Sequence, residues 1–351
     1  FFGIIIVSFV KLIIRSQLVN CAISYRNNMG KRMFKKSLSP LFLLLSSLVI
    51  AGCDNAQDTS TTQSTEKQTL TIEHAQGTTE IPAHPQKVVV MNMETLDIVD
   101  ALGVPVVGLP QTNVHLPKFL EKYTNENEYI NEGGLFEPNY EKLSTTAPDL
   151  ILTGSRARDA YAKLSEIAPS ISMDIDSTRF IDSLTERTTT LGQIFGKEEQ
   201  AKKLLADFNS KIDTVKAKTP DAGKAMVVLV SGGKISAYGP GSRFGFIYDV
   251  LGFEPAYTFD SPGSHGNIVN SELLLKLNPD WMFVIDRDAA IGREDSQPAK
   301  QVLDNALVRK VNAWNKDQII YLDASSIYIS GGIQTYSRLM DTINQALDQK
   351  K

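Results

Sequence analysis

Three arginines in this chain have the chemistry and the local context expected of an anion-binding site. Arg156 and Arg287 each follow an apolar stretch that reads as a strand, and Arg243 follows the turn Gly239-Pro240-Gly241-Ser242. A guanidinium group is planar, stays charged and can donate hydrogen bonds to two oxygen atoms at once. Arg243 also precedes a helix predicted near residues 244–251, where an anionic ligand explains a basic side chain better than helix stability does. Taken singly, each arginine could equally form a solvated surface ion pair.

Two of these arginines belong to an internal repeat whose matched positions are 131 residues apart. The first copy reads Asn139-Tyr140-Glu141, then Ala147-Pro148-Asp149, an apolar strand and Arg156; the second reads Asn270-Ser271-Glu272, then Asn278-Pro279-Asp280, an apolar strand and Arg287. Such a repeat predicts two lobes that are built alike. Because ligands of open α/β sheets lie outside the carboxyl ends of the strands, both arginines are expected to face one cleft. Chance recurrence of a common helix–strand phrase is the alternative.

Regular secondary structure is predicted from residue 70 onward. The sequence predicts strands at 70–74, 78–81, 87–91, 104–109, 149–152 and 225–230, and helices at 95–102, 180–194 and 197–218. Strands that alternate with helices indicate an α/β fold with mostly parallel sheets. The helix at 197–218 carries apolar residues at helical spacing, and its length of roughly 32 Å would suffice to bridge two lobes.

The first 52 residues are predicted to be a targeting region that precedes the fold. From Met33, two lysines are followed by the apolar run 41–50, whose ten residues are too few to span a bilayer. The next residues, Ile50-Ala51-Gly52-Cys53, resemble a bacterial lipobox, which implies that Cys53 carries lipid. A cleaved soluble signal peptide with a chance cysteine is the alternative.

Other features around this leader are consistent with export. Residues 1–28 are interpreted as an over-extended gene model, with an additional membrane segment as the alternative. The chain has two cysteines, Cys21 and Cys53, so the body offers no thiol for a disulfide, a metal site or a nucleophile. Asp54 resembles the signal that keeps lipoproteins of Gram-negative bacteria at the inner membrane. Residues 53–68 are polar and are predicted to form a flexible tether.

Charge and motif content exclude several classes of function. Residues 1–52 hold seven Lys/Arg and no Asp/Glu, so residues 53–351 hold 29 basic and 40 acidic side chains, a balance that disfavours nucleic-acid binding. The chain lacks a Gly-x-Ser-x-Gly elbow, a His-Glu-x-x-His motif and a Walker loop, so an enzyme is not expected. Only four histidines are present, which argues against direct capture of Zn²⁺ or Mn²⁺.

The lipobox, the α/β pattern and both repeat phrases together resemble the helical-backbone (class III) periplasmic substrate-binding proteins, which serve importers of ferric siderophores, haem and cobalamin. The resemblance covers residues 70–348. It implies an α/β fold with two pseudo-symmetric lobes, each with a central, mostly parallel sheet. One long rigid helix would bridge the lobes, and the ligand cleft would lie between them. We therefore expect an N-terminal lobe at 69–196, the bridging helix at 197–218 and a C-terminal lobe at 219–351.

A smaller set of residues resembles the subgroup that binds ferric catecholate siderophores. The matching residues are Gly154-Ser155-Arg156, the run from Gly239 to Gly245, Ser264-His265-Gly266 and Asp286-Arg287-Asp288. The resemblance implies that Arg156, Arg243 and Arg287 bind the catecholate oxygens of an anionic iron complex. It further implies that His265 and Tyr328 complete the iron shell when the siderophore is tetradentate. Haem, cobalamin or another ferric chelate bound on the same fold is the alternative.

The resemblance also implies the partners and the location. A monomer without a cofactor, anchored by lipid on the periplasmic side of the inner membrane, would deliver the ferric siderophore to an ABC-type permease. Glu141 and Glu272 occupy matched positions, and carboxylates would repel an anionic ligand. We therefore expect these two residues to form salt bridges with equivalent basic patches of a two-fold permease. Exposed glutamates on solvated helices are the alternative.

Overall fold

The computed structural model describes residues 68–259 and 265–349, which belong to one compact unit that spans residues 64–351. The predicted leader, the lipobox with Cys53, Asp54 and almost all of the tether lie outside the described residues. A search of the described residues finds no helix that is both long enough and apolar enough to cross a membrane.

The first lobe is built on a five-stranded parallel sheet with the strand order β5-β4-β3-β6-β7. Its strands are β3 (Val88–Val90), β4 (Gly108–Leu109), β5 (Ile130–Asn131), β6 (Leu150–Thr153) and β7 (Ser170–Ser172). The connecting helices are α2 (Met93–Ala101), the 3₁₀ helix η1 (Lys118–Thr124), α3 (Tyr140–Thr146), the 3₁₀ helix η2 (Ser155–Ala160) and α4 (Tyr161–Ile167). The antiparallel hairpin of β1 (Thr69–His74) and β2 (Gly77–Pro82) packs against β7.

The second lobe contains a six-stranded mixed sheet with the order β11-β9-β8-β12-β13, in which β10 also pairs with β8. Its strands are β8 (Lys224–Ser231), β9 (Lys234–Tyr238), β10 (Glu254–Pro255), β11 (Asn267–Val269), β12 (Trp281–Asp286) and β13 (Ile319–Tyr321). β9 pairs antiparallel with both β8 and β11, and the other strand pairs of this sheet are parallel. The helices of this lobe are α7 (Phe246–Asp249), α8 (Ser271–Leu277), α9 (Arg287–Ala290), α10 (Ala299–Leu303), the 3₁₀ helix η4 (Val308–Lys310) and α11 (Asn312–Asn315).

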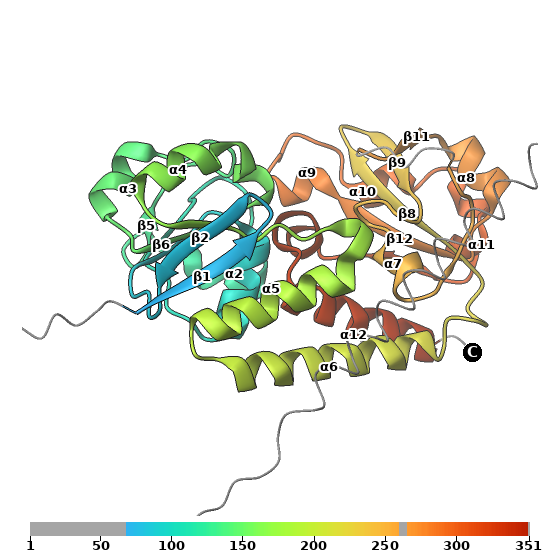
Figure 1. The fold of residues 1–351 in the computed structure, drawn as a ribbon. Helices are drawn as coiled ribbons and strands as arrows, with labels where there is room; N and C mark the ends of the chain where they lie inside the picture. The colour runs from blue at the N-terminus through green and yellow to red at the C-terminus, as the bar shows by residue number, and fades with distance from the viewer. Residues whose placement is uncertain (1–67, 260–264, 350–351) are drawn as a thin grey trace, which may run out of the picture. The chain divides into compact units, whose positions relative to one another are not determined.

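Helices join the two sheets. After the 3₁₀ helix η3 (Ser177–Arg179), α5 (Phe180–Ile194) and α6 (Glu198–Lys216) connect β7 to β8. Beyond β13, the chain forms a π-helix, η5 (Ser325–Ser330), and the final helix α12 (Ile333–Gln349), which packs on both α6 and α2 (Figure 1). One hydrophobic cluster contains buried side chains from both sheets and from these helices. The predicted two-lobed α/β fold with a bridging helix is confirmed.

The two copies of the repeat have the same local geometry. Asn139 and Asn270 cap α3 and α8, each accepting a hydrogen bond from the third backbone N–H that follows it, over 3.0 and 2.9 Å. Both helices end at a residue in the left-handed region, Ala147 with φ 48° and Asn278 with φ 45°. β6 and β12 then lie at equivalent places, each flanked by parallel strands. The pattern therefore specifies helix start, helix end and strand in both lobes.

The aspartates of the repeat tie each copy to its neighbouring strand. Asp149 accepts hydrogen bonds from the backbone N–H groups of Gln86 and Lys87, both over 2.9 Å, just before β3. Asp280 accepts from the backbone N–H of Lys224, the first residue of β8, over 3.1 Å. These bonds tie the start of β6 to the start of β3 and the start of β12 to the start of β8.

The structure differs from the sequence-based expectation in some element boundaries. The strand predicted at 104–109 is reduced to β4, Gly108–Leu109, and Pro105, which has no N–H to donate to a sheet ladder, precedes it. The helix predicted near 244–251 is reduced to α7, Phe246–Asp249. Residues 325–330 form a π-helix that was not predicted, a rare conformation that often accompanies functional sites.

Candidate functional site

The three arginines meet at Tyr328. Arg156 follows β6 and lies in η2, Arg287 follows β12 and begins α9, and Arg243 lies in the turn before α7. Arg156 Nη2 and Arg243 Nη2 donate hydrogen bonds to the main-chain carbonyl of Tyr328 over 2.6 and 2.8 Å. Arg287 Nε donates to the Tyr328 hydroxyl over 2.8 Å. The structure thus brings together four of the five ligand-site residues that the sequence suggested.

All three guanidinium groups also lie near the ring of Tyr328. The distances from the guanidinium carbon to the ring centroid are 4.6 Å for Arg243, 5.4 Å for Arg287 and 5.8 Å for Arg156. The negative face of an aromatic ring attracts cations at this range. Tyr328 therefore gathers positive charge from both lobes around one half-buried side chain.

This charge changes the titration of the groups in the site. Burial by itself would raise the pKa of the Tyr328 hydroxyl, but the hydrogen bond and the charge of Arg287, with the other two guanidinium charges, lower it below its ordinary value of 10.0. Burial and the nearby charge of Arg243 lower the pKa of Arg156. The site thus stabilises the phenolate form relative to a tyrosine in water and concentrates positive charge, which suits an anionic ligand.

Aspartates hold the arginine-bearing turns in place. Asp174 accepts hydrogen bonds from the backbone N–H of Ser155 over 2.5 Å and from Arg158 Nη2 over 2.8 Å, next to Arg156. In the other lobe, the buried Asp288 accepts from the Ser231 hydroxyl over 3.0 Å. Arg287 Nη1 donates to the same hydroxyl over 3.2 Å. Each lobe therefore fixes its arginine through a partly or fully buried carboxylate.

A small cavity of about 70 Å³ lies beside these arginines. Its lining includes Glu94, Arg243, Phe244, Ser330 and Tyr336. Burial raises the pKa of Glu94, while the charges of Arg156 and Arg243 act in the opposite direction. Phe180 and Tyr336, which line the cavity, form a cluster of rings with Phe246, and the ring centroids lie 4.5–5.2 Å apart. Glu94 and these aromatic residues were not candidates from the sequence, because buried aromatic residues on helices usually belong to the core.

His265 is the one proposed ligand residue that does not join the cluster. It is exposed, it follows residues 260–264, which lie outside the described part, and it precedes β11. Within the described residues no hydrogen bond connects His265 to the arginines or to Tyr328. The next residue, Gly266, packs so tightly on Tyr238 that an added Cβ would lie 2.8 Å from its ring. The described residues also contain no group of three or more His, Cys, Asp or Glu side chains placed to hold a metal ion.

Glu141 and Glu272 are both exposed and both lie in the first turn of their helices, α3 and α8. Neither contributes to the cavity beside the arginines. The structure therefore places these carboxylates on solvent-facing positions that are equivalent in the two lobes, apart from the arginine cluster.

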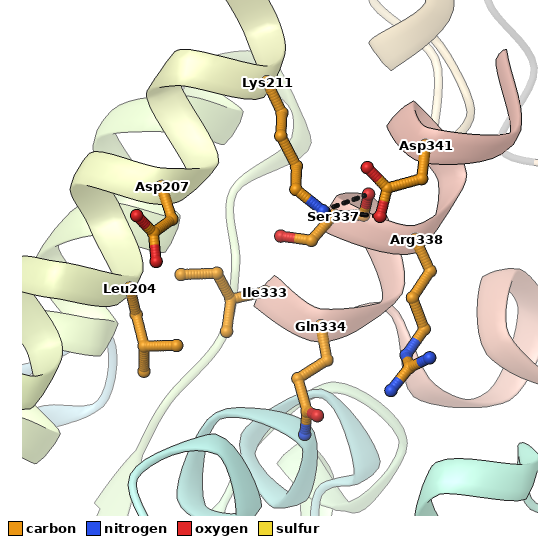
Figure 2. A pocket seen from close by; sticks show the side chains of 8 residues that line it. All are labelled: Leu204, Asp207, Lys211, Ile333, Gln334, Ser337, Arg338 and Asp341. Carbon is orange, nitrogen blue, oxygen red and sulfur yellow. Dashed lines mark hydrogen bonds and ion pairs between the residues drawn. The ribbon is translucent and has the colours of Figure 1, made fainter. Parts of the chain in front are cut away.

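A larger groove of about 330 Å³ lies between α6 and α12, and Figure 2 shows the residues that line it. Its charged side chains pair with one another or with neighbours. Lys211 Nζ donates to Asp341 Oδ2 over 2.5 Å, and Asp207 pairs with Lys203 over 2.6 Å. Arg338 lies 4.7 Å from the centroid of the Phe119 ring. The cations that line the groove, Lys211 and Arg338, thus already have partners, so the groove is a weaker candidate for an anion site than the arginine cluster.

The model of one protein family, described as periplasmic binding protein, matches residues 88–326. The matched range contains both repeats and all three arginines. The chain belongs to the periplasmic binding protein family.

Individual members of this family match the chain over almost their whole length. The petrobactin-binding protein YclQ of Bacillus subtilis is 36% identical over 321 residues, which cover 90% of this chain and all of the relative. The ferric-anguibactin-binding protein FatB of Vibrio anguillarum is 35% identical over 319 residues, covering 89% of this chain and 98% of the relative.

Solved structures of the family agree with the fold. The crystal structure of YclQ superposes with a TM-score of 0.76 at 37% identity and covers 81% of this chain and 100% of that one. The catecholate-siderophore-binding protein VctP of Vibrio cholerae superposes with a TM-score of 0.74 at 30% identity and covers 79% of this chain and 100% of that one. Two further relatives from Bacillus subtilis are named a probable siderophore-binding lipoprotein, YfiY, and a putative ABC transporter substrate-binding lipoprotein, YhfQ.

Proposed function

We propose that this protein captures a ferric siderophore and delivers it to an ABC-type permease. The observation that carries the proposal is the convergence of Arg156, Arg243 and Arg287, from both lobes, on Tyr328. Three guanidinium groups held around one residue repel one another, and an anionic complex with outward-facing oxygens relieves that repulsion. The ligands named for the relatives, which are petrobactin, anguibactin and a catecholate siderophore, support the same ligand class.

Ligand entry requires the arginines to change partners. The cavity of about 70 Å³ is small beside the roughly 300–1,000 Å³ of pockets that enclose small molecules. Arg156 and Arg243 donate to the carbonyl of Tyr328, an acceptor that they can exchange for a siderophore oxygen. The exchange replaces a neutral acceptor with a charged one, so each guanidinium gains a stronger hydrogen bond.

Tyr328 and His265 would ligate iron directly when the siderophore is tetradentate. The lowered pKa of the Tyr328 hydroxyl supports this role, because iron binds the phenolate and not the neutral phenol. His265 would have to move toward the cleft from its exposed position before β11. A hexadentate siderophore would fill the iron shell by itself, and Tyr328 and His265 would then lie next to the complex without ligating iron.

The cellular arrangement follows from the same assignment. We infer that Cys53 carries a lipid that anchors the protein on the periplasmic side of the inner membrane, and that the protein works as a monomer without covalent chemistry. The exposed, equivalent positions of Glu141 and Glu272 suit docking to a permease with two matched basic patches. Relatives named as lipoproteins support the anchor.

A ligand panel tests the proposal. The purified protein is titrated with ferric bis- and tris-catecholates, with the iron-free siderophores, with haemin and with cobalamin, while intrinsic fluorescence and visible absorption are recorded. We expect tight binding of at least one ferric catecholate and much weaker binding of its iron-free form. Preferential binding of haemin or cobalamin would favour the alternative ligand class. Absence of binding to every anionic chelate would refute the assignment.

A further inference from the structure

Asp97 is a carboxylate on α2 of the first lobe that is fully buried, with 0% of its surface exposed. Its Oδ1 accepts a hydrogen bond from the backbone N–H of Gln334 over 2.7 Å. Its Oδ2 accepts from the Thr335 N–H over 3.0 Å, the Thr335 hydroxyl over 2.8 Å and the Ser330 hydroxyl over 3.1 Å. All of these donors belong to the segment 325–349, which leaves the second sheet and forms η5 and α12.

The backbone of segment 325–349 approaches α2 very closely at this point. A Cβ atom added to Gly332 would lie 2.5 Å from the Cβ of Asp97 and 2.6 Å from the carbonyl oxygen of Glu94. The side chain of Gln334 adds hydrogen bonds to the Asp97 carbonyl over 2.9 Å and to Asp100 Oδ2 over 2.8 Å. Any side chain at position 332 would therefore force this segment or α2 to shift.

The same segment carries Tyr328, the centre of the candidate site. Ser330, which donates to Asp97, is the last residue of η5 and lies two positions after Tyr328. The first lobe therefore holds η5 at two places, through Asp97 and through Arg156, which donates to the carbonyls of Tyr328 and Ile329. An anionic ligand would compete for the guanidinium of Arg156, whereas Asp97 is fully buried and its partners are neutral groups.

Fold stability alone does not account for an acid at this position. Burial raises the pKa of Asp97 to about 6, and the hydrogen bonds from Gln334, Thr335 and Ser330 act against that rise. A buried charge held only by neutral donors costs more free energy than a neutral group of the same shape. The carboxylate instead fixes the relative position of three helices, because its two oxygens accept hydrogen bonds from η5 and from the first turn of α12 while its backbone belongs to α2.

We propose that Asp97 is a positioning residue for the ligand site. Its hydrogen bonds form a latch that holds helix η5, which carries Tyr328, against α2. The latch keeps the arginines of the two lobes aligned when the ligand draws Arg156 away from Tyr328. The inference rests on the proposed function only in taking the arginine cluster as the ligand site. The latch itself is a property of the ligand-free protein and is tested as such.

The test uses the full chain with Cys21 and Cys53 replaced by serine, so that two new cysteines are the only thiols. Spin labels at the exposed positions Glu166→Cys and Lys276→Cys, on α4 and α8, report the distance between the lobes by pulsed electron paramagnetic resonance. The variants are Asp97→Asn, Asp97→Ala and Thr335→Val, and each is combined with Arg156→Ala to mimic loss of the arginine contact. Ferric siderophore dissociation constants are measured in parallel, with Arg156 intact.

We expect the distance distribution to broaden in the order wild type, Asp97→Asn, Asp97→Ala, because asparagine keeps one acceptor oxygen and alanine keeps none. The dissociation constant should rise in the same order, reaching at least about tenfold for Asp97→Ala. Thr335→Val removes one donor without disturbing a charge, so it keeps the test valid if Asp97→Ala does not fold. Thr335→Val should also broaden the distance distribution and raise the dissociation constant, by a smaller factor than Asp97→Ala.

Asp280→Asn serves as the matched control. Asp280 also accepts several hydrogen bonds, from the Lys224 N–H, Asn312 Nδ2 and Lys316 Nζ, but all of them lie within the second lobe. Asp280→Asn should lower the melting temperature of the protein without widening the distance distribution between the lobes or weakening siderophore binding. Unchanged distributions and dissociation constants within twofold for Asp97→Ala and Thr335→Val would overturn the proposal, as would an equal effect of Asp280→Asn. If no ferric siderophore binds the wild-type protein, the proposed function fails, and the ligand-free distances still decide whether the latch exists.

Discussion

The Nε atom of Arg287 donates a hydrogen bond to the hydroxyl of Tyr328 over 2.8 Å, although the two residues lie 41 positions apart in the sequence. The bond joins the end of the central strand β12 to the π-helix η5. It gives Tyr328 a charged partner at its hydroxyl, while its main-chain carbonyl accepts from the other two arginines. One residue thus connects every cation of the candidate site.

The first prediction concerns the titration of Tyr328. Its pKa lies below 10.0 because Arg287 and the other arginines outweigh the effect of burial. Arg287→Leu should therefore raise this pKa, since it removes both a hydrogen bond to the phenolate and a positive charge. Absorbance at the phenolate band is followed against pH in each protein, and the curve of the matching Tyr328→Phe variant is subtracted. A Tyr328 pKa that is the same with and without Arg287 would contradict the electrostatic picture.

The second prediction concerns ligand affinity. Replacing Arg156, Arg243 or Arg287 with alanine should each weaken binding of a ferric catecholate by roughly 1.5–3 kcal/mol, the range for a hydrogen bond to a charged group. Fluorescence titration measures the effect. Arg309→Ala provides a control, because Arg309 pairs with Asp304 on the surface. If all three site variants bound within twofold of wild type, the arginine cluster would not be the ligand site.

The third prediction tests direct ligation of iron. A tetradentate ferric catecholate should show a shifted ligand-to-metal charge-transfer band when it binds, because His265 and Tyr328 replace water in the iron shell. His265→Ala and Tyr328→Phe should each abolish part of the shift, whereas a hexadentate siderophore should show none in any variant. An unshifted band with the wild-type protein would remove the ligation claim and leave the arginine claim intact.

The fourth prediction concerns docking. Glu141→Arg combined with Glu272→Arg should leave siderophore affinity nearly unchanged and should abolish uptake by cells, because reversed charges repel basic patches on the permease. The control is Glu199→Arg combined with Glu254→Arg, which reverses two exposed glutamates outside the repeat. Uptake is measured with radioactive iron at matched expression. Normal uptake by the first variant would rule out docking through these residues, and lost affinity would place them in the ligand site instead.

The fifth prediction concerns the close contact between Gly332 and α2. Gly332→Ala should lower the free energy of unfolding by roughly 1–3 kcal/mol, because the new methyl group would overlap Asp97 and cannot be accommodated without moving a helix. Denaturant unfolding measures the change. Gly134→Ala is the control, since a Cβ there would meet only atoms at ordinary contact distance, 3.6 Å or more. Equal stability of wild type and Gly332→Ala would show that the segment can shift.

Sequence alone predicted the parts of the fold that depend on neighbours along the chain. The apolar strands of the two repeat copies formed as predicted, as β6 and β12. The caps at Asn139 and Asn270 and the helix ends at Ala147 and Asn278 were not predicted, although they lie within about 20 residues of the arginine in each lobe. The same repeat placed Arg156 and Arg287 past equivalent strands. In each sheet the arginine lies past the carboxyl end of its strand, where open α/β sheets bind ligands, so a cleft shared by the two lobes could be predicted from the repeat.

Tertiary structure decided which atoms these arginines meet. Arg156 reaches the Tyr328 carbonyl across 172 positions, and Asp97 accepts from Thr335 across 238 positions, separations over which no periodicity or spacing carries information. The π-helix at 325–330 likewise could not be predicted from local propensity, because its hydrogen-bond partners Arg156, Arg243 and Asp97 are distant in the sequence. The sequence by itself therefore determined the type of ligand chemistry and the two lobes that supply it. The position of one lobe relative to the other depends on buried contacts, and these contacts form only when both lobes have packed against α12.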